Sequence, residues 1–136
     1  MPVQIRSAGL GFSTLYYSDD GGFVWQRSKS DLSIKLGGGM GFAAFVEPTV
    51  AEVRDGRLIM IGRNSTGRMW KSVSSDRGER FCDPVPMDLA ASHSPALITR
   101  IPSTDHLMLA WNQVYEFYIL SMPHIHACTH RPQQAI

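Results

Sequence analysis

Two stretches of this chain repeat one eight-residue pattern: serine, any residue, aspartate, any residue, glycine, any two residues, aromatic. They occupy residues 18–25 and 74–81, so the octets lie 56 residues apart (76 − 20). Their defining members are Ser18, Asp20, Gly22, Trp25, Ser74, Asp76, Gly78 and Phe81. Serine and aspartate side chains accept hydrogen bonds from turn N–H groups, and glycine supplies a positive φ. Because the aromatic side chain is then available for burial, each octet predicts the tip of a β-hairpin.

The residues before and between the octets have the composition of antiparallel strands. Runs of apolar, aromatic and β-branched side chains occupy residues 12–17, 49–53, 57–63 and 68–73. Asp55-Gly56, between two of these runs, is a strong hairpin signal. With Phe81-Cys82 as the fourth strand, residues 47–86 are expected to form one four-stranded antiparallel sheet.

A second repeat follows that unit. Residues 94–113 resemble its first two strands, although the octet then due near position 132 is absent. Repetition at this spacing indicates a β-propeller. We therefore expect a single domain with an all-β fold, a partial β-propeller of about two and a half four-stranded blades. Its parts are an outer hairpin at 9–27, a complete blade at 47–86, an inner hairpin at 94–113 and a divergent tail at 115–136.

Composition excludes several classes of protein. The 136 residues include 13 basic and 12 acidic side chains, so no basic surface for nucleic acid or an anionic membrane is indicated. No apolar run approaches the roughly 20 residues of a membrane span. The first residues carry no secretory signal, and localisation stays open. The two cysteines, Cys82 and Cys128, are expected to be free thiols.

Length raises a separate question. A closed propeller needs at least four blades of about 40–50 residues. The chain is thus expected to be a fragment, a truncated reading frame or a piece completed by other chains. Open blade edges would favour self-association, and apolar side chains such as Trp25, Met60 and Trp70 are expected to be uncovered.

Hairpin geometry brings two charged residues together. Connections alternate between the two ends of an antiparallel meander, so Asp55-Gly56 and both octets share one end. Glu47 and Arg63 flank the Asp55-Gly56 turn at matched distances and therefore share the other end. A carboxylate and a guanidinium placed there can meet each other or one ligand.

The octets resemble the Asp-box of BNR-repeat sialidases (neuraminidases), which are six-bladed propellers. The usual threonine before the aromatic residue is replaced by Val24 and Arg80. The pattern from Glu47 through Asp55-Gly56 to Arg63 is similar to the central sialidase motif. The resemblance covers residues from about 9 to 114 and is closest to bacterial sialidase-like hydrolases.

This resemblance implies an activity and two site residues. The family activity is exo-α-sialidase, hydrolysis of terminal sialic acid from glycoconjugates, and full-length relatives are often secreted or periplasmic. Glu47 would be catalytic, accepting the proton of a tyrosine nucleophile. Arg63 would be substrate-binding, as one of three arginines that hold the sialic acid carboxylate. The expected ligand is a sialylated or related glycan, with no cofactor and no metal.

Most of the catalytic machinery is missing. No candidate is found for the acid/base aspartate or the third arginine. Nor is there one for the nucleophile, because Tyr115 and Tyr118 lie beyond the resemblance. We therefore expect this chain to be inactive alone. The alternatives are a non-catalytic Asp-box module that binds glycans or protein, and an inactive remnant. The Glu47–Arg63 pair would then be a structural ion pair.

Four further features are interpreted without a role in the site. Arg100-Ile101-Pro102 matches a sialidase signature but is expected at the octet end of the sheet. Asn64-Ser65-Thr66 is a glycosylation triplet expected to stay unmodified, and Arg68 is expected to be solvated. The alternating histidines and Cys128 in residues 124–130 suit zinc, but a short tract of this kind is compositional only.

Overall fold

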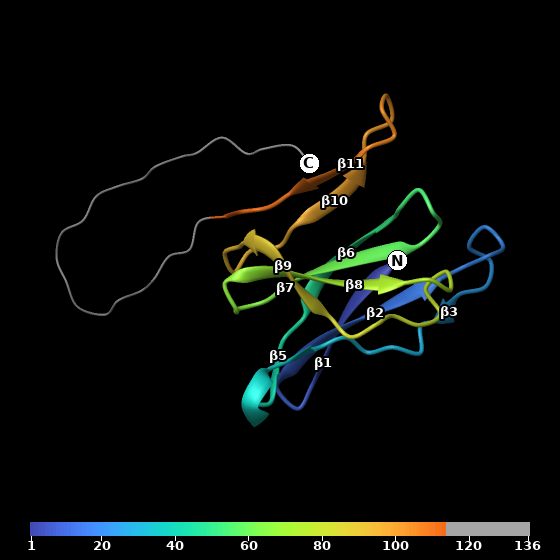
Figure 1. The fold of residues 1–136 in the computed structure, drawn as a ribbon. Coiled ribbons are helices and arrows are strands. Elements are labelled where there is room, and N and C mark those ends of the chain that lie inside the picture. Colours follow the sequence, from blue (N-terminus) through green and yellow to red (C-terminus); the bar gives the residue numbers. More distant parts are fainter. Residues whose placement is uncertain (114–136) are drawn as a thin grey trace.

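The computed structural model describes residues 1–113, which form β-strands and one short 3-10 turn (Figure 1). The strands are β1 (Pro2–Ser7), β2 (Leu10–Tyr17), β3 (Gln26–Arg27), β4 (Ile34–Lys35), β5 (Phe42–Ala43), β6 (Val46–Glu52), β7 (Leu58–Arg63), β8 (Arg68–Ser74), β9 (Val85–Ala90), β10 (Leu97–Arg100) and β11 (Leu107–Ala110). The 3-10 turn spans Gly37–Gly39. Within this part of the chain no helix is long and apolar enough to cross a membrane. The expected all-β fold, a partial propeller, is confirmed.

The central sheet is a four-stranded antiparallel meander in the order β6-β7-β8-β9. The turn at Asp55-Gly56 joins β6 to β7, and Gly56 has a φ of 82°. The outer strand differs from its prediction: β9 begins at Val85, not at Phe81-Cys82. The Cys82 N–H does donate to the Val73 carbonyl at 2.9 Å. Regular pairing is interrupted after it because Pro84 has no N–H to donate.

The neighbouring sheet, in the order β1-β2-β3, repeats the last three strands of the central sheet. The first octet joins β2 to β3, and the second joins β8 to β9. Strand β1 extends the outer hairpin that was expected at 9–27. It pairs with β2 through a two-residue turn, Ala8-Gly9, in which both residues have a positive φ, as type I′ turns require. The connection to the central sheet contains a second small hairpin, β4-β5.

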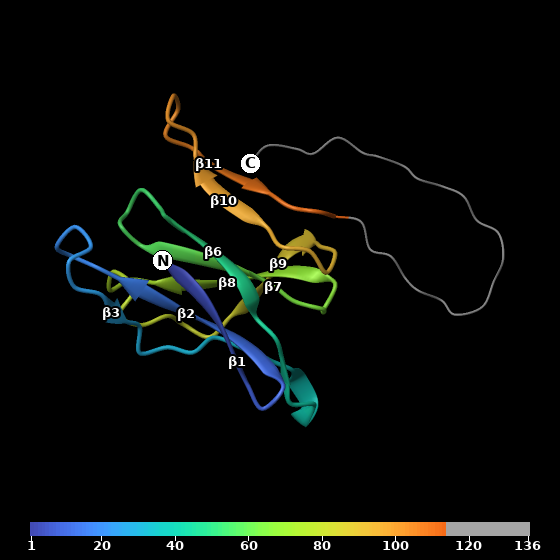
Figure 2. The same ribbon diagram turned by 180° about the vertical axis from the view of Figure 1, so that it is seen from behind.

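A third sheet, β10-β11, forms the inner hairpin within residues 94–113. Figures 1 and 2 show β6 between this hairpin on one side and β1 and β2 on the other. The apolar cores lie between adjacent sheets. Between the first and central sheets the buried side chains are Leu15, Leu32, Ile34, Phe45, Met60 and Phe81. On the other side of the central sheet they are Ile61, Met69, Ala91 and Ile98.

Two of the three apolar side chains expected to be uncovered are covered. Met60 is fully buried, and Trp70 is half-buried against the first core. Only Trp25, at 51% exposure, behaves as expected. The difference arises because Met60 and Trp70 belong to the central sheet, which has a neighbouring sheet on each side.

Candidate functional site

The site lies at one end of the sheets, which we call the site rim, formed by residues 44–48, 63–68 and 91–93. Both octets and the Asp55-Gly56 turn lie at the opposite end, because connections alternate along each meander. The structure brings Glu47 and Arg63 together at the site rim. Arg63 Nη2 donates to Glu47 Oε1 at 2.9 Å, and Arg63 Nε lies 2.7 Å from Glu47 Oε2 without hydrogen-bond alignment. The two side chains thus form an ion pair with one hydrogen bond and a second close contact, which we call the fork.

A β-bulge places Glu47. Val46 pairs with Arg63 and Thr49 pairs with Ile61, so Glu47 and Pro48 together face the single residue between them on β7. Without this bulge, the register of the rest of β6 and β7 would pair Glu47 directly with Arg63. Pro48 cannot donate to the ladder, and a bulge accommodates it.

The backbone of Glu47 adopts a strained conformation. Its φ is 47°, in the left-handed region that costs a non-glycine residue about 1–2 kcal/mol. Its N–H donates to Gln4 Oε1 of β1 at 3.2 Å, so the neighbouring sheet holds this conformation. On the facing strand, a Cβ at Gly62 would lie 2.8 Å from the Phe45 ring, and only glycine fits there without movement. Strain of this kind concentrates at functional sites.

Sequence reasoning missed a third member of the site, His93. Its Nε2 lies 3.0 Å from Arg63 Nη1. No local pattern marks this histidine. Its position after the fourth strand becomes a signal only once that strand is known to end at Ala90, on the site rim.

The site rim also holds unsatisfied polar groups. Among residues 1–113, two buried side-chain polar atoms have no hydrogen-bond partner, Arg63 Nε and Ser92 Oγ. Ser92 immediately precedes His93 in the rim loop. Buried polar groups are usually satisfied, and each exception requires an explanation such as a functional role or a bound water.

The other sequence candidates lie apart from this site or serve the fold. Arg100 is at the octet end, where Nη1 donates to Asp105 Oδ1 at 2.7 Å and Nη2 bonds the Glu52 carbonyl. Arg68 begins β8 at the site rim with an exposed side chain. No cluster that could hold a metal occurs in residues 1–113. The zinc candidate at 124–130 lies outside the described residues, as do Tyr115 and Tyr118.

Asn64 is buried rather than available for glycosylation. Its Nδ2 donates to the Arg68 carbonyl at 3.1 Å, and its Oδ1 accepts from Thr66 N at 2.8 Å. The side chain therefore shapes the turn between β7 and β8 that leads away from Arg63.

The two octets form the same hydrogen bonds. Ser18 and Ser74 each accept from the glycine N–H four residues later at 2.8 Å, and each donates to the aspartate of its octet. Asp20 accepts from Val24 N, and Asp76 accepts from Arg80 N. These backbone bonds, ahead of the serine contact, lower the pKa of both aspartates, because the bonds favour the ionised form.

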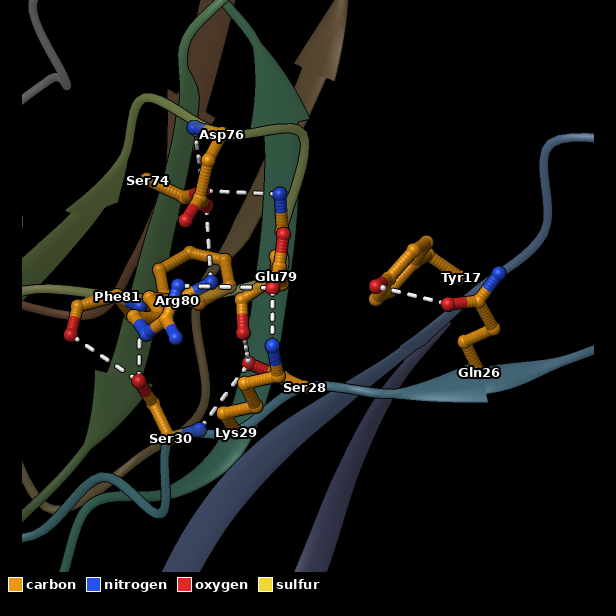
Figure 3. A network of polar contacts seen from close by, with 11 residues as sticks. Tyr17, Gln26, Ser28, Lys29, Ser30, Ser74, Asp76, Glu79, Arg80 and Phe81 are labelled. Carbon is orange, nitrogen blue, oxygen red and sulfur yellow. Dashed lines mark hydrogen bonds and ion pairs between the residues drawn. The ribbon is translucent and has the colours of Figure 1, made fainter.

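The second octet also joins two sheets (Figure 3). Ser28 and Lys29, which follow β3, donate to the Glu79 carbonyl at 3.2 and 2.8 Å. Ser30 Oγ donates to the Phe81 carbonyl at 3.2 Å and accepts from Phe81 N at 2.9 Å. Lys29 and Glu79 form an ion pair. The second octet is therefore an anchor for the neighbouring sheet as well as a turn.

The fold and these octets define a BNR-repeat propeller protein. The family model of the BNR repeat-like domain matches residues 1–121, and the chain belongs to this family. The match extends at both ends beyond residues 9–114, the range in which the sequence resembled sialidases, and includes Tyr115 and Tyr118. Among curated proteins, none matches this chain.

Solved structures share the fold. A protein of unknown function from Dyadobacter fermentans DSM 18053 gives a TM-score of 0.60 at 22% identity, covering 79% of this chain and 28% of that one. A mutant of the NanB sialidase from Streptococcus pneumoniae gives 0.58 at 21% identity, covering 78% of this chain and 16% of that one. The chain thus spans less than a third of either protein. The likeness to NanB places the chain in a sialidase-like fold.

Proposed function

We propose that this chain carries part of the substrate site of a sialidase-like glycoside hydrolase. Arg63 would bind the carboxylate of a terminal sialic acid on a glycoconjugate, and Glu47 would accept a proton from a phenol nucleophile. The fork between Glu47 and Arg63 at the site rim carries the proposal. Membership of the BNR repeat-like family and the fold shared with NanB sialidase support it.

The edges of the Arg63 guanidinium support a ligand-binding role. Glu47 lies along the edge formed by Nε and Nη2. The end formed by Nη1 and Nη2 retains N–H groups, because each of these nitrogens carries two hydrogens and makes one hydrogen bond among residues 1–113. A planar carboxylate can accept two parallel bonds from such an end. The side chain is 17% exposed, so the charge is partly shielded from water.

The setting of Glu47 supports a role as a proton acceptor. Its side chain is 41% exposed beside Arg63 and can therefore reach a reacting group. A phenol has a pKa near 10 and is a weak nucleophile unless a base takes its proton. The bond from its N–H to Gln4 holds the backbone of Glu47, and Arg63 holds its carboxylate.

The nucleophile of the proposed reaction is not provided by the described tyrosines. Tyr16 and Tyr17 end β2 at the octet end of the sheet, away from Glu47. We further propose that the 136-residue chain does not hydrolyse sialosides by itself, because its sequence offers no candidate for the acid/base aspartate or the third arginine.

Binding of N-acetylneuraminic acid, measured by ligand-observed NMR, tests the proposal. We expect the chain to bind the free acid more tightly than its methyl ester, and Arg63→Ala to remove the difference. Arg68→Ala is the matched control, because it removes the same charge from the same rim. Equal affinity for acid and ester, or an equal loss of affinity in Arg63→Ala and Arg68→Ala, would leave Glu47–Arg63 as a structural ion pair.

The binding measurement, combined with an assay for release of the acid from a sialoside, separates a non-catalytic module from an enzyme component. If a longer protein that contains this chain binds the acid through Arg63 without releasing it from a sialoside, the binding-module alternative holds. If neither binding nor turnover occurs, the chain is an inactive remnant.

A further inference from the structure

We propose that His93 is a positioning residue for Arg63. Its neutral imidazole accepts a hydrogen bond from Arg63 Nη1 and, together with Glu47, fixes the plane of the guanidinium. The consequence for ligand binding rests on the proposed function. The hydrogen bond between His93 and Arg63 does not depend on that function.

Chemistry fixes the direction of this hydrogen bond. A guanidinium carries five N–H donors and no acceptor, and it stays protonated in proteins. The 3.0 Å contact between Arg63 Nη1 and His93 Nε2 can therefore form only if Nε2 is unprotonated. The imidazole is then the neutral tautomer with its proton on Nδ1.

The contact completes a support on two sides of the guanidinium. Glu47, from the bulge in β6, lies along Nε and Nη2, whereas His93 approaches Nη1 from the loop after β9. Arg63 itself ends β7. Two partners from separate elements restrain rotation about the last side-chain bonds, so less conformational entropy is lost when a ligand binds.

The backbone around His93 is anchored, which makes its position specific. Ala91 N donates to the Gly67 carbonyl at 3.1 Å, in the turn between β7 and β8. Ser92 N donates to the Asn112 carbonyl at 2.8 Å, just after β11. The loop is thus tied both to the central sheet and to the third sheet. In this way the third sheet contributes to the geometry around Arg63.

The ring nitrogens of His93 provide a test that needs no ligand. Nitrogen NMR of the ¹⁵N-labelled 136-residue chain distinguishes protonated from unprotonated ring nitrogens. We expect an unprotonated Nε2 and a protonated Nδ1 in His93, and a changed Nε2 shift in Arg63→Ala. His106, exposed in the turn between β10 and β11, is the internal control and should not respond. A protonated Nε2, or an Nε2 shift that is insensitive to Arg63→Ala, would overturn the proposal.

Substitutions test the effect on the ligand. His93→Leu removes the acceptor, and we expect the affinity for N-acetylneuraminic acid to fall about fivefold, as for a lost hydrogen bond. His93→Gln keeps an acceptor and should restore most of the affinity. His106→Leu should change neither affinity nor thermal midpoint.

The outcomes separate the two proposals. If Arg63→Ala weakens binding and His93→Leu does not, Arg63 binds the carboxylate but His93 does not position it. If no variant or wild-type chain binds the acid, the proposed function fails, and the ring nitrogen shifts still decide whether His93 holds Arg63.

Discussion

Trp25 and Phe81 occupy the last position of the two octets, which lie in adjacent sheets, yet Trp25 is 51% exposed and Phe81 is 8% exposed. The Ser30 hydroxyl, which follows β3, bonds both the N–H and the carbonyl of Phe81. The Phe81 ring packs in the core between the first and central sheets. Trp25 borders an open hollow with Tyr17 and Leu58. The burial of this motif residue is therefore decided by what covers it.

Truncation of these aromatic residues should have unequal effects. Phe81→Ala should lower the free energy of unfolding by about 3–5 kcal/mol, because it leaves a cavity in the core. Trp25→Ala should cost much less, since half of that side chain already faces water. Urea unfolding of both variants measures the difference. Equal losses would show that the octets are buried alike.

The octet glycines offer a matched pair for testing backbone strain. Gly22 and Gly78 have φ values of 98° and 95°. An alanine at either position should lose about 1–2 kcal/mol from the positive φ. Gly78→Ala should lose more, because its Cβ would lie 2.5 Å from Leu15 Cδ2, whereas the nearest atom to a Cβ at Gly22 is 3.9 Å away. Thermal midpoints that rank the other way would contradict this packing.

Acid should weaken the fold through the octet aspartates. The pKa of Asp76 is lowered in the folded state, first by the bond from Arg80 N, so its stabilisation is present above the unfolded pKa of about 3.9. That stabilisation is lost as pH falls through the lower folded pKa. We expect Asp76→Asn to flatten the decrease in unfolding free energy below about pH 4.

Asp19, which adjoins the octet aspartate Asp20, provides a control for net charge. Asp19→Asn removes an equal charge, and in residues 1–113 the Asp19 carboxylate makes no hydrogen bond to its turn. Its pH profile should match that of the wild-type chain. If both variants flatten the profile equally, net charge rather than turn geometry is responsible.

Open sheet edges should promote association. In residues 1–113, β1 pairs with β2 alone and β11 with β10 alone, which leaves one edge of each strand unpaired. Phe23 and Trp25 add exposed aromatic surface. We propose that the isolated chain self-associates through these features, because unpaired edges and apolar patches favour contact between chains. Sedimentation velocity should show oligomers, and a stable monomer at high concentration would contradict this.

Activity measurements should separate the roles of the site residues. In a longer active protein, Arg63→Ala should mainly raise KM because it removes a carboxylate clamp. Glu47→Gln should mainly lower kcat because the base is lost. The purified 136-residue chain should release no product from a fluorogenic sialoside. Robust turnover by that chain would refute the claim that it lacks essential groups.

Local patterns in the sequence were sufficient to predict the octet turns and most strands. The bonds of an octet join residues two to four positions apart, so Ser74, Asp76 and Gly78 specify their turn without distant contacts. Alternating hairpin ends were likewise sufficient to place Glu47 and Arg63 on one rim. The outer strand was misplaced because Pro84 interrupts a ladder that composition alone suggested would be continuous.

Tertiary contacts decided the rest. The left-handed backbone of Glu47 is held by Gln4 from another sheet, and Gly62 is required because the Phe45 ring lies against it. His93 reaches Arg63 from a position 30 residues later in the chain, through a loop tied to two sheets. A sequence specifies bonds between neighbours directly. The partners across sheets are specified only when packing selects which faces meet.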